Sequence, residues 1–174
     1  MCNNQAPSVK EALEICEGLY VLDDRDRKIL SILQRNAATP VTEIADRVAL
    51  SVSACSRRIG RLEDEGYITR RVVVLDRAKM GVPTIVFALV KTTHHTEEWV
   101  ERFRKAIADI PEVVEAHRLT GNFDYLLKIL LPRAEHYDHV YKEVIRKVEL
   151  FDVSASISME VMKADEGMPV GYAG

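Results

Sequence analysis

The sequence of 174 residues lacks the features that mark secreted and membrane proteins. Its N-terminus has no basic segment followed by an apolar core, and no stretch approaches the roughly 18 consecutive apolar residues of a membrane-spanning helix. Cysteine is scarce: the three cysteines, at positions 2, 16 and 55, are odd in number and have no metal-like spacing. We therefore expect a cytoplasmic protein with reduced thiols, without a bound metal or cofactor.

Positive charge is also scarce over the whole chain, which has a net charge of −3, but it is unevenly distributed. Residues 22–81 carry 12 Lys or Arg and 9 Asp or Glu, a net charge of +3. Residues 82–174 carry 11 and 15, a net charge of −4, and residues 1–21 add −2. Contacts with phosphate groups require local positive charge, so any nucleic-acid contact is expected within residues 22–81.

Residues 39–71 have the pattern of two short helices joined by a tight turn. Pro40 suits a first helical position, and Ser51 is a natural N-cap for the second helix. Apolar residues at helical spacing give each helix one buried stripe: Ile44, Ala45 and Val48 in the first, and Cys55, Ile59 and Leu62 in the second. Cys55 is therefore expected to be a packing residue rather than a redox switch.

The opposite face of the second helix carries hydroxyl and guanidinium groups, which suit the major groove of DNA. We predict a recognition helix at residues 52–65. A preceding helix is expected with Asp23 as its N-cap, and a strand at residues 70–75 is expected to act as a wing. A merely solvated face is the alternative. The residues predicted to contact DNA are Ser51, Ser53, Ser56, Arg57, Arg58, Arg61 and Arg70.

From Pro83 onward the pattern changes to alternating strands and helices. Strands are predicted at residues 84–91, 113–119, 124–131 and 153–161, and helices after Thr96 and at residues 134–148. This βαββαβ order is that of a ferredoxin-like split sandwich, whose uncovered sheet face favours a homodimer. The expected class is α+β, with the following parts: an N-terminal extension (1–21), a helix-turn-helix domain (22–75), a linker (76–82), a ferredoxin-like domain (83–162) and a tail (163–174).

Several short strings, in this order, resemble the Lrp/AsnC family of feast/famine transcription regulators over roughly residues 22–170. They are Leu22-Asp23-x-x-Asp26-x-x-Ile29-Leu30, Leu50-Ser51-x-Ser53 with Arg58 and Arg61-Leu62-Glu63, Gly66-Tyr67-Ile68, and Thr120-Gly121-x-Phe123-Asp124-Tyr125. The resemblance implies an N-terminal winged helix-turn-helix and a C-terminal ferredoxin-like RAM domain. It also implies double-stranded DNA as partner, homodimers that assemble into tetramers or octamers, and small amino-acid effectors bound between dimers.

In such relatives the effector lies near the loop that here comprises Thr120, Gly121, Asn122, Phe123, Asp124 and Tyr125. Asp124 would accept from an effector's ammonium group, with Phe123 and Tyr125 as apolar walls. A simple turn at Gly121 is the alternative. The string Lys91-Thr92-x-His94-His95, with Trp99, is similar to a family branch linked to cysteine sensing. Asp165-Glu166 replace the family's Thr-Thr pair, which favours an amine-bearing ligand.

Three other interpretations stay open. His94 and His95 would point to opposite faces of a continuing strand, so a metal site there competes with effector contact or a solvated strand end. His136 and His139 lie one helical turn apart but lack a nearby third ligand. Some proteins similar to this family act as sirohaem decarboxylases, whose histidines and arginines surround a tetrapyrrole; here His117-Arg118 is the only such adjacent pair in the second domain. We predict a regulator rather than an enzyme.

Overall fold

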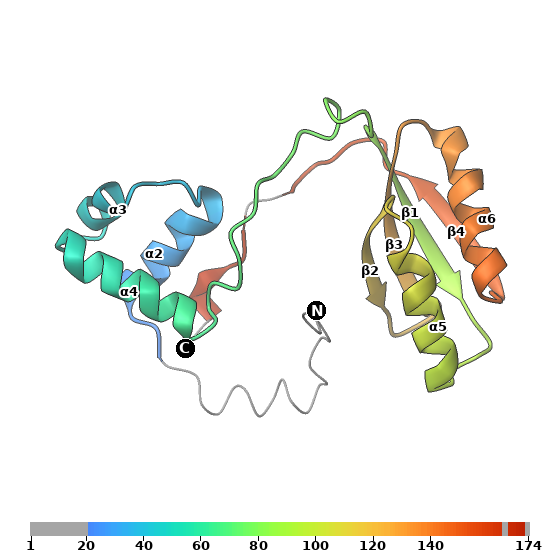
Figure 1. The fold of residues 1–174 in the computed structure, drawn as a ribbon, viewed down its shortest axis with the longest axis horizontal. Helices are drawn as coiled ribbons and strands as arrows, with labels where there is room; N and C mark the ends of the chain where they lie inside the picture. The colour runs from blue at the N-terminus through green and yellow to red at the C-terminus, as the bar shows by residue number, and fades with distance from the viewer. Residues whose placement is uncertain (1–20, 165–166, 173–174) are drawn as a thin grey trace. The chain divides into compact units, whose positions relative to one another are not determined.

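The computed structural model describes residues 21–164 and 167–172, and these residues form two units (Figure 1). The first unit contains the residues up to Val73 and those from Lys163 onward, and the second is Val74–Met162. The C-terminal segment, which we expected to be a separate tail, is thus grouped with the N-terminal unit. The expectations for residues 1–20 and for Asp165 and Glu166 lie outside the described residues.

The first unit is built from three helices, α2 (Asp24–Arg35), α3 (Val41–Arg47) and α4 (Val52–Asp64). The N-cap of α2 is Asp23, as predicted, and it forms a capping box in which the Asp26 N–H donates to Asp23 Oδ1 at 2.8 Å. The N-cap of α4 is Ser51, also as predicted, since the Ala54 N–H donates to Ser51 Oγ at 3.2 Å. Pro40 is the N-cap of α3, one residue before the predicted position.

Both predicted apolar stripes lie in the core of this unit. The core consists of Leu22, Ile29, Leu33, Ile44, Ala45, Val48, Cys55, Ile59 and Leu62. Burial raises the pKa of the Cys55 thiol, which favours the protonated packing role over a reactive one. Gly66, at φ +78°, ends α4 with a left-handed residue, and the Ile68 N–H donates to the Leu62 carbonyl at 3.0 Å.

The strand predicted at residues 70–75 is wrong, because these residues form no strand. A strand requires a hydrogen-bonded neighbour, and no described segment pairs with this one. Its apolar side chains, Val72, Val73, Val74 and Leu75, are exposed. The segment therefore runs from the three helices to the second unit as irregular chain.

The second unit confirms the βαββαβ order. Its elements are β1 (Thr84–Lys91), α5 (Glu97–Ala108), β2 (Val113–Arg118), β3 (Tyr125–Leu131), the 3-10 turn η1 (Ala134–His136), α6 (Tyr137–Lys147) and β4 (Asp152–Ile157). The antiparallel sheet has the order β2-β3-β1-β4, with α5 and α6 packed on one face (Figure 1). No described helix is long and apolar enough to cross a membrane.

The last strand, β4, ends four residues before its predicted end at residue 161. Ile157 pairs with Val86, and the Ser158 N–H donates to the Ile85 carbonyl at 2.9 Å. Because β1 begins at Thr84, the partner strand ends almost at this point, and the following Met159 is fully exposed. The chain then leaves the sheet for the first unit.

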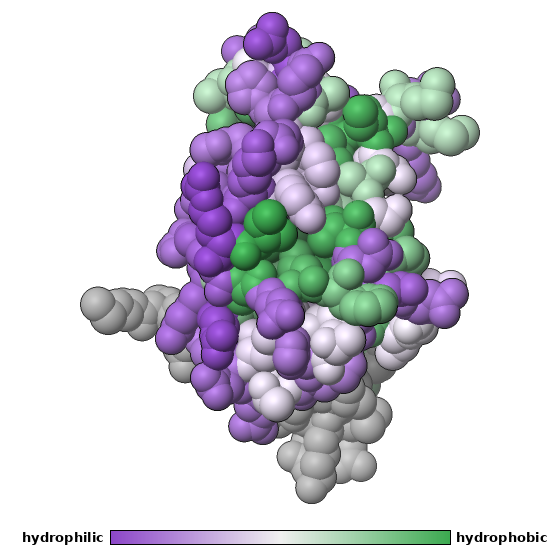
Figure 2. Space-filling model, turned by 90° about the vertical axis from the view of Figure 1, so that its right-hand side faces the viewer, coloured by the Kyte–Doolittle hydropathy of each residue, from purple (hydrophilic) through white to green (hydrophobic). Residues whose placement is uncertain are grey.

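Two apolar surfaces of the second unit are not covered by its own helices. The helix-covered face contains Val86, Ala88, Val90, Leu127 and Ile129. The opposite face carries half-buried apolar side chains, namely Phe87, Leu89, Leu126 and Leu130. A second set is exposed on α6 and around β4, namely Tyr141, Ile145, Phe151 and Ile157. Figure 2, which views the side where α6 and β4 lie in Figure 1, shows an apolar patch bordered by hydrophilic side chains.

Candidate nucleic-acid interface and ligand loop

Helix α4 presents a polar face to solvent at its N-terminal half. Ser53, Ser56 and Arg57 are exposed there, opposite the buried stripe of Cys55. Ser51 Oγ caps the helix and lies 3.2 Å from Ser53 Oγ. Backbone N–H groups and hydroxyls at a helix N-terminus attract phosphate oxygens. The face therefore has the groups that the sequence analysis expected at a DNA contact.

Arg58 and Arg61 do not simply face solvent, because both contact one buried carboxylate of α2. Arg58 Nη1 donates to Asp26 Oδ1 at 2.9 Å, and Arg61 Nη2 donates to Asp26 Oδ2 at 2.9 Å. The side chain of Asp26 is fully buried, whereas those of Arg58 and Arg61 are 25% and 32% exposed. We call Asp26, Arg58 and Arg61, together with Asp23, the Asp26 cluster.

Asp23 connects the cluster to the start of α2. Arg58 Nη1 also donates to Asp23 Oδ2 at 2.6 Å. The pKa of Asp23 is lowered from 3.8 to about 2, mainly by the backbone N–H of Asp26; burial opposes this effect, and the Arg58 guanidinium adds to it. The same ion pairs raise the pKa of Arg58. Asp23 is therefore ionised at neutral pH, and the cluster joins the N-terminal turn of α2 to the middle of α4.

The seven residues predicted to contact DNA thus fall into two groups. Arg58 and Arg61 hold the recognition helix against α2 and are only partly available to a ligand. Arg57 is exposed, and no ion pair with another described residue holds it. Arg70 is exposed as well, while the neighbouring Arg71 donates to Glu63 at 2.8 Å. Among the arginines of α4, Arg57 is exposed, whereas Arg58 and Arg61 are half-buried.

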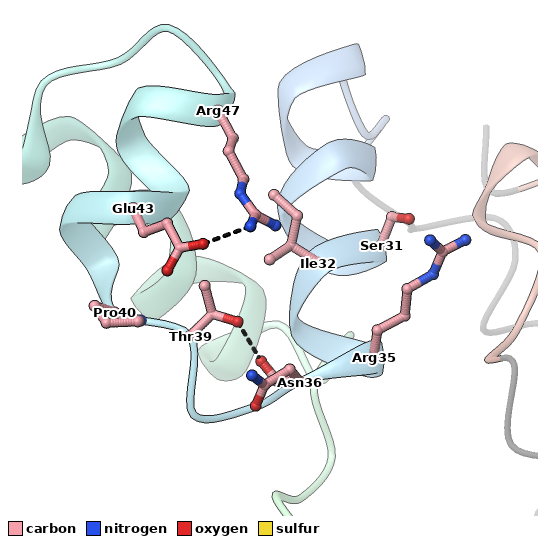
Figure 3. A pocket seen from close by; sticks show the side chains of 8 residues that line it. All are labelled: Ser31, Ile32, Arg35, Asn36, Thr39, Pro40, Glu43 and Arg47. Atoms are coloured by element: carbon pink, nitrogen blue, oxygen red, sulfur yellow. Dashed lines mark hydrogen bonds and ion pairs between the residues drawn. The ribbon is translucent and has the colours of Figure 1, made fainter.

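A polar recess of about 360 Å³ lies between α2 and α3 (Figure 3). Its lining comprises Ser31, Ile32, Arg35, Asn36, Thr39, Pro40, Glu43 and Arg47. Arg47 pairs with Glu43 across it, and the Thr39 hydroxyl donates to the Asn36 carbonyl at 2.8 Å. The recess belongs to the three-helix unit and contains none of the residues expected to bind an effector.

The loop between β2 and β3 is the segment predicted to bind an effector. Thr120, Gly121 and Asn122 are exposed, and Gly121 has φ +114°, a conformation that favours glycine. The carboxylate of Asp124 accepts from the Thr92 N–H at 2.8 Å, and its own N–H donates to the Val90 carbonyl at 2.9 Å. Asp124 therefore anchors this loop to the end of β1 as well as presenting a charge.

Tyr125 does not line this loop, so its prediction as a pocket wall is wrong. Its buried ring lies 4.6 Å from the ring centre of Phe103 and 5.8 Å from that of Trp99, under the helices. The register pairs it with Val90, which places both side chains on the helix-covered face. Phe123 remains at the loop, half-buried, with Lys91 Nζ 5.0 Å from its ring centre.

The histidines occupy separate places in the second unit. His94 follows β1 in a turn where its N–H donates to Thr92 Oγ1 at 3.0 Å, and its Nε2 lies 3.7 Å from Glu149. Among the described residues no group of three or more His, Cys, Asp or Glu side chains could hold a metal. His117 pairs with Leu126 and Arg118 with Tyr125, so these neighbours lie on opposite faces of the sheet.

Two features of the site were missed by the sequence analysis. Asp26 was named only as part of the string that begins at Leu22, although it is the centre of the cluster that holds α4. The capping-box spacing from Asp23 to Asp26 gave a partial signal for it. Gln34 bonds to the backbone of Met168, 134 residues later, and no local pattern indicates that contact.

Comparisons with known proteins match both units. The model of a winged helix-turn-helix DNA-binding domain matches residues 22–69, and that of the Lrp/AsnC ligand binding domain matches residues 85–168. The HTH-type transcriptional regulator Zrp of Zymomonas mobilis is 55% identical over 152 residues, covering 87% of this chain and 99% of that protein.

Solved structures agree. An AsnC family transcriptional regulator from Agrobacterium tumefaciens is 41% identical with a TM-score of 0.83, over 87% of this chain and 99% of that one. The transcriptional regulator NMB0573 of Neisseria meningitidis, solved as a complex with L-Met, is 29% identical with a TM-score of 0.82, over 87% and 98%. The chain described here belongs to the Lrp/AsnC family of DNA-binding transcription regulators.

Proposed function

We propose that this protein is a sequence-specific regulator whose DNA affinity or assembly changes with a small amino-acid effector. The observation that carries the proposal is the recognition helix α4, which the Asp26 cluster holds in place while Arg57 and the serines stay exposed. A rigidly held basic helix face is what base recognition requires. Because its target is DNA, we place its action in the cytoplasm.

The alternative of a sirohaem-decarboxylase-like enzyme has less support. It would need histidine and arginine side chains gathered around one tetrapyrrole, and His117 and Arg118 lie on opposite sheet faces. His117 Nε2 instead lies 3.7 Å from Glu115 on the face away from the helices. The enzyme would also leave the polar face of α4 without a role.

For the effector, we propose the loop at residues 120–124 together with Lys91. Asp124 offers an anion, and Lys91, whose Nζ lies 5.0 Å from the Phe123 ring centre, offers a cation; the two are complementary to the two charges of a free amino acid. The relative from Neisseria meningitidis was solved with L-Met, a sulfur amino acid. We therefore propose a sulfur amino acid, such as cysteine or methionine, as the effector class.

Substitution of Asp124 by asparagine tests the effector site. An amide oxygen can still accept from the Thr92 N–H, so the loop stays anchored, but the charge that would pair with an ammonium group is lost. We expect affinity for L-methionine or L-cysteine to fall by about tenfold or more, in line with the roughly 1.5–3 kcal/mol of a hydrogen bond to a charged group. Calorimetry measures the affinity, and gel shifts with and without the amino acid measure the response of DNA binding.

The matched control is Asp138→Asn, which removes an exposed carboxylate of α6 whose ion pair within the described part of the chain is with Lys142. It should bind the amino acids as the wild type does. If Asp124→Asn also binds and responds like the wild type, the effector site lies elsewhere, and the turn of His94 and His95 is the next place to examine.

For assembly, we propose a homodimer that associates further into tetramers or octamers. The second unit has two sets of apolar side chains outside its helix-covered core, one on the uncovered sheet face and one on α6 and around β4. A dimer occupies one such surface, and a larger closed assembly needs a second. We assign the sheet face to the dimer and the surface of α6 and β4 to the association of dimers.

Two charged substitutions separate these interfaces. Leu126→Asp places a carboxylate on the sheet face and is expected to give monomers, whereas Ile145→Glu on α6 should stop assembly at the dimer. Each buried unpaired charge costs several kcal/mol at an interface, enough to dissociate it at micromolar concentration. Light scattering gives the masses, with Lys105→Asp on the exposed side of α5 as control. Unchanged masses in both variants would refute the assignment.

A further inference from the structure

The C-terminal segment 167–172 returns to the three-helix unit and attaches to α2. Its contact is reciprocal: the Met168 N–H donates to Gln34 Oε1 at 2.8 Å, and Gln34 Nε2 donates to the Met168 carbonyl at 3.0 Å. The side-chain amide of Gln34 thus pairs with one residue of backbone as a neighbouring strand would. We call residues 167–172, which end in the 3-10 turn η2 (Val170–Tyr172), the C-terminal strap.

Gly167 is required for this contact on two independent grounds. Its φ is +84°, which L side chains rarely adopt. A Cβ at this position would also lie 2.5 Å from Gln34 Cδ and 2.7 Å from Gln34 Oε1. A side chain at residue 167 would therefore displace the same amide that binds Met168.

The strap is attached lightly. Met168 is 79% exposed and Tyr172 90% exposed, and only Val170 is half-buried. Two solvent-exposed hydrogen bonds contribute little net stability, so attachment and release lie close in free energy. An element of this kind can be shifted by a small change elsewhere in the chain.

The chain passes between the two units twice, and the strap follows the second of these connections. The first connection leaves the three-helix unit at Val73, and the second leaves the sheet after β4 and re-enters the three-helix unit at Lys163. The strap binds α2, the helix that also carries Asp26 and so holds the recognition helix α4. A change at the end of β4 thus has a covalent path to the helix that orients α4.

We propose that the C-terminal strap, attached through Gln34, is the surface by which the ligand-binding unit alters DNA binding by α4. This inference rests on the proposed effector response. It assigns to residues 167–172 the role of an intramolecular partner for α2, released or tightened as the effector binds.

Variants of the full chain test it: Gln34→Ala removes the amide, Gly167→Ala displaces it, and Gly171→Ala is the matched control, since a Cβ there meets nothing within 4 Å. Hydrogen exchange reports attachment through the Met168 amide. Because the strap is held only weakly, we expect this amide to exchange several-fold more slowly in the wild type and the control than in the other two variants. An unprotected Met168 amide in the wild type would overturn the attachment itself.

Coupling is measured as the ratio of DNA affinities with and without L-methionine or L-cysteine. Allosteric ratios are commonly about 5–150-fold. Gln34→Ala and Gly167→Ala should keep wild-type amino-acid affinity by calorimetry, while the ratio of DNA affinities with and without the amino acid falls to within about twofold of unity. The inference would be overturned if variants whose Met168 amide exchanges freely kept the wild-type ratio of DNA affinities. If the DNA affinity of the wild-type protein changed with no amino acid, the proposed function itself would be wrong. That outcome is observed on the wild type alone, so it is distinguishable from a failure of the inference.

Discussion

Replacing Asp26 by alanine is expected to lower the free energy of unfolding of the three-helix unit by about 2–4 kcal/mol. The substitution removes a fully buried carboxylate that accepts from both Arg58 and Arg61. Breaking a buried ion pair from one side costs about 3–5 kcal/mol because the remaining charge is left without compensation. Here the two guanidiniums are partly exposed and can turn toward water, so we expect a loss that overlaps the lower part of that range and extends about 1 kcal/mol below it.

The chain offers an internal control for this measurement. Its single tryptophan, Trp99, is buried in the core of the second unit. Urea unfolding followed by helical circular dichroism should show a destabilised component in Asp26→Ala, while the transition of Trp99 fluorescence stays where it is. Asp24→Ala, whose side chain is 94% exposed, should cost less than about 1 kcal/mol. An Asp26→Ala variant as stable as the wild type would show that the cluster does not hold α4.

The elements that were predicted best are those whose periodicity is set by burial on one face. Strand β1 was predicted to the residue, and α4 to within one residue at its end, because long apolar patterns at a constant spacing leave little freedom. The predictions of the end of β4 and of a strand at residues 70–75 were wrong for the same reason. A strand needs a partner, and residue composition does not tell where the partner ends.

The candidate site was less predictable because it depends on contacts between distant segments. The outward face of α4 follows from local spacing, but the engagement of Arg58 with Asp26 spans 32 residues, and that of Gln34 with Met168 spans 134. Tyr125 is different, since its position was encoded locally. It shares strand parity with Leu127 and Ile129, which lie under the helices, and that alternation indicates a core residue rather than a loop wall.

Arg57→Ala is expected to weaken binding to the operator by about 1–3 kcal/mol, or roughly 5–150-fold, with no loss of fold stability. Arg57 is exposed on α4 and takes no part in the Asp26 cluster, so its removal should leave the three-helix core intact. Arg58→Ala should behave differently, lowering stability and DNA affinity together, because its guanidinium joins Asp23 and Asp26. Gel shifts on the promoter of its own operon, paired with urea unfolding, separate the two effects.

The salt dependence of binding tells what Arg57 contacts. If its guanidinium reads a base edge, Arg57→Ala loses affinity for the operator but little for unrelated DNA. If it contacts a phosphate, affinity falls for all sequences alike, and the slope of log K against log salt decreases by about 1. Lys105→Ala on α5 removes the same charge from the second unit and controls for net charge. Operator binding by Arg57→Ala that equals the wild type at every salt concentration would exclude Arg57 from the DNA contact, and the exposed Arg70 would then be the residue to substitute.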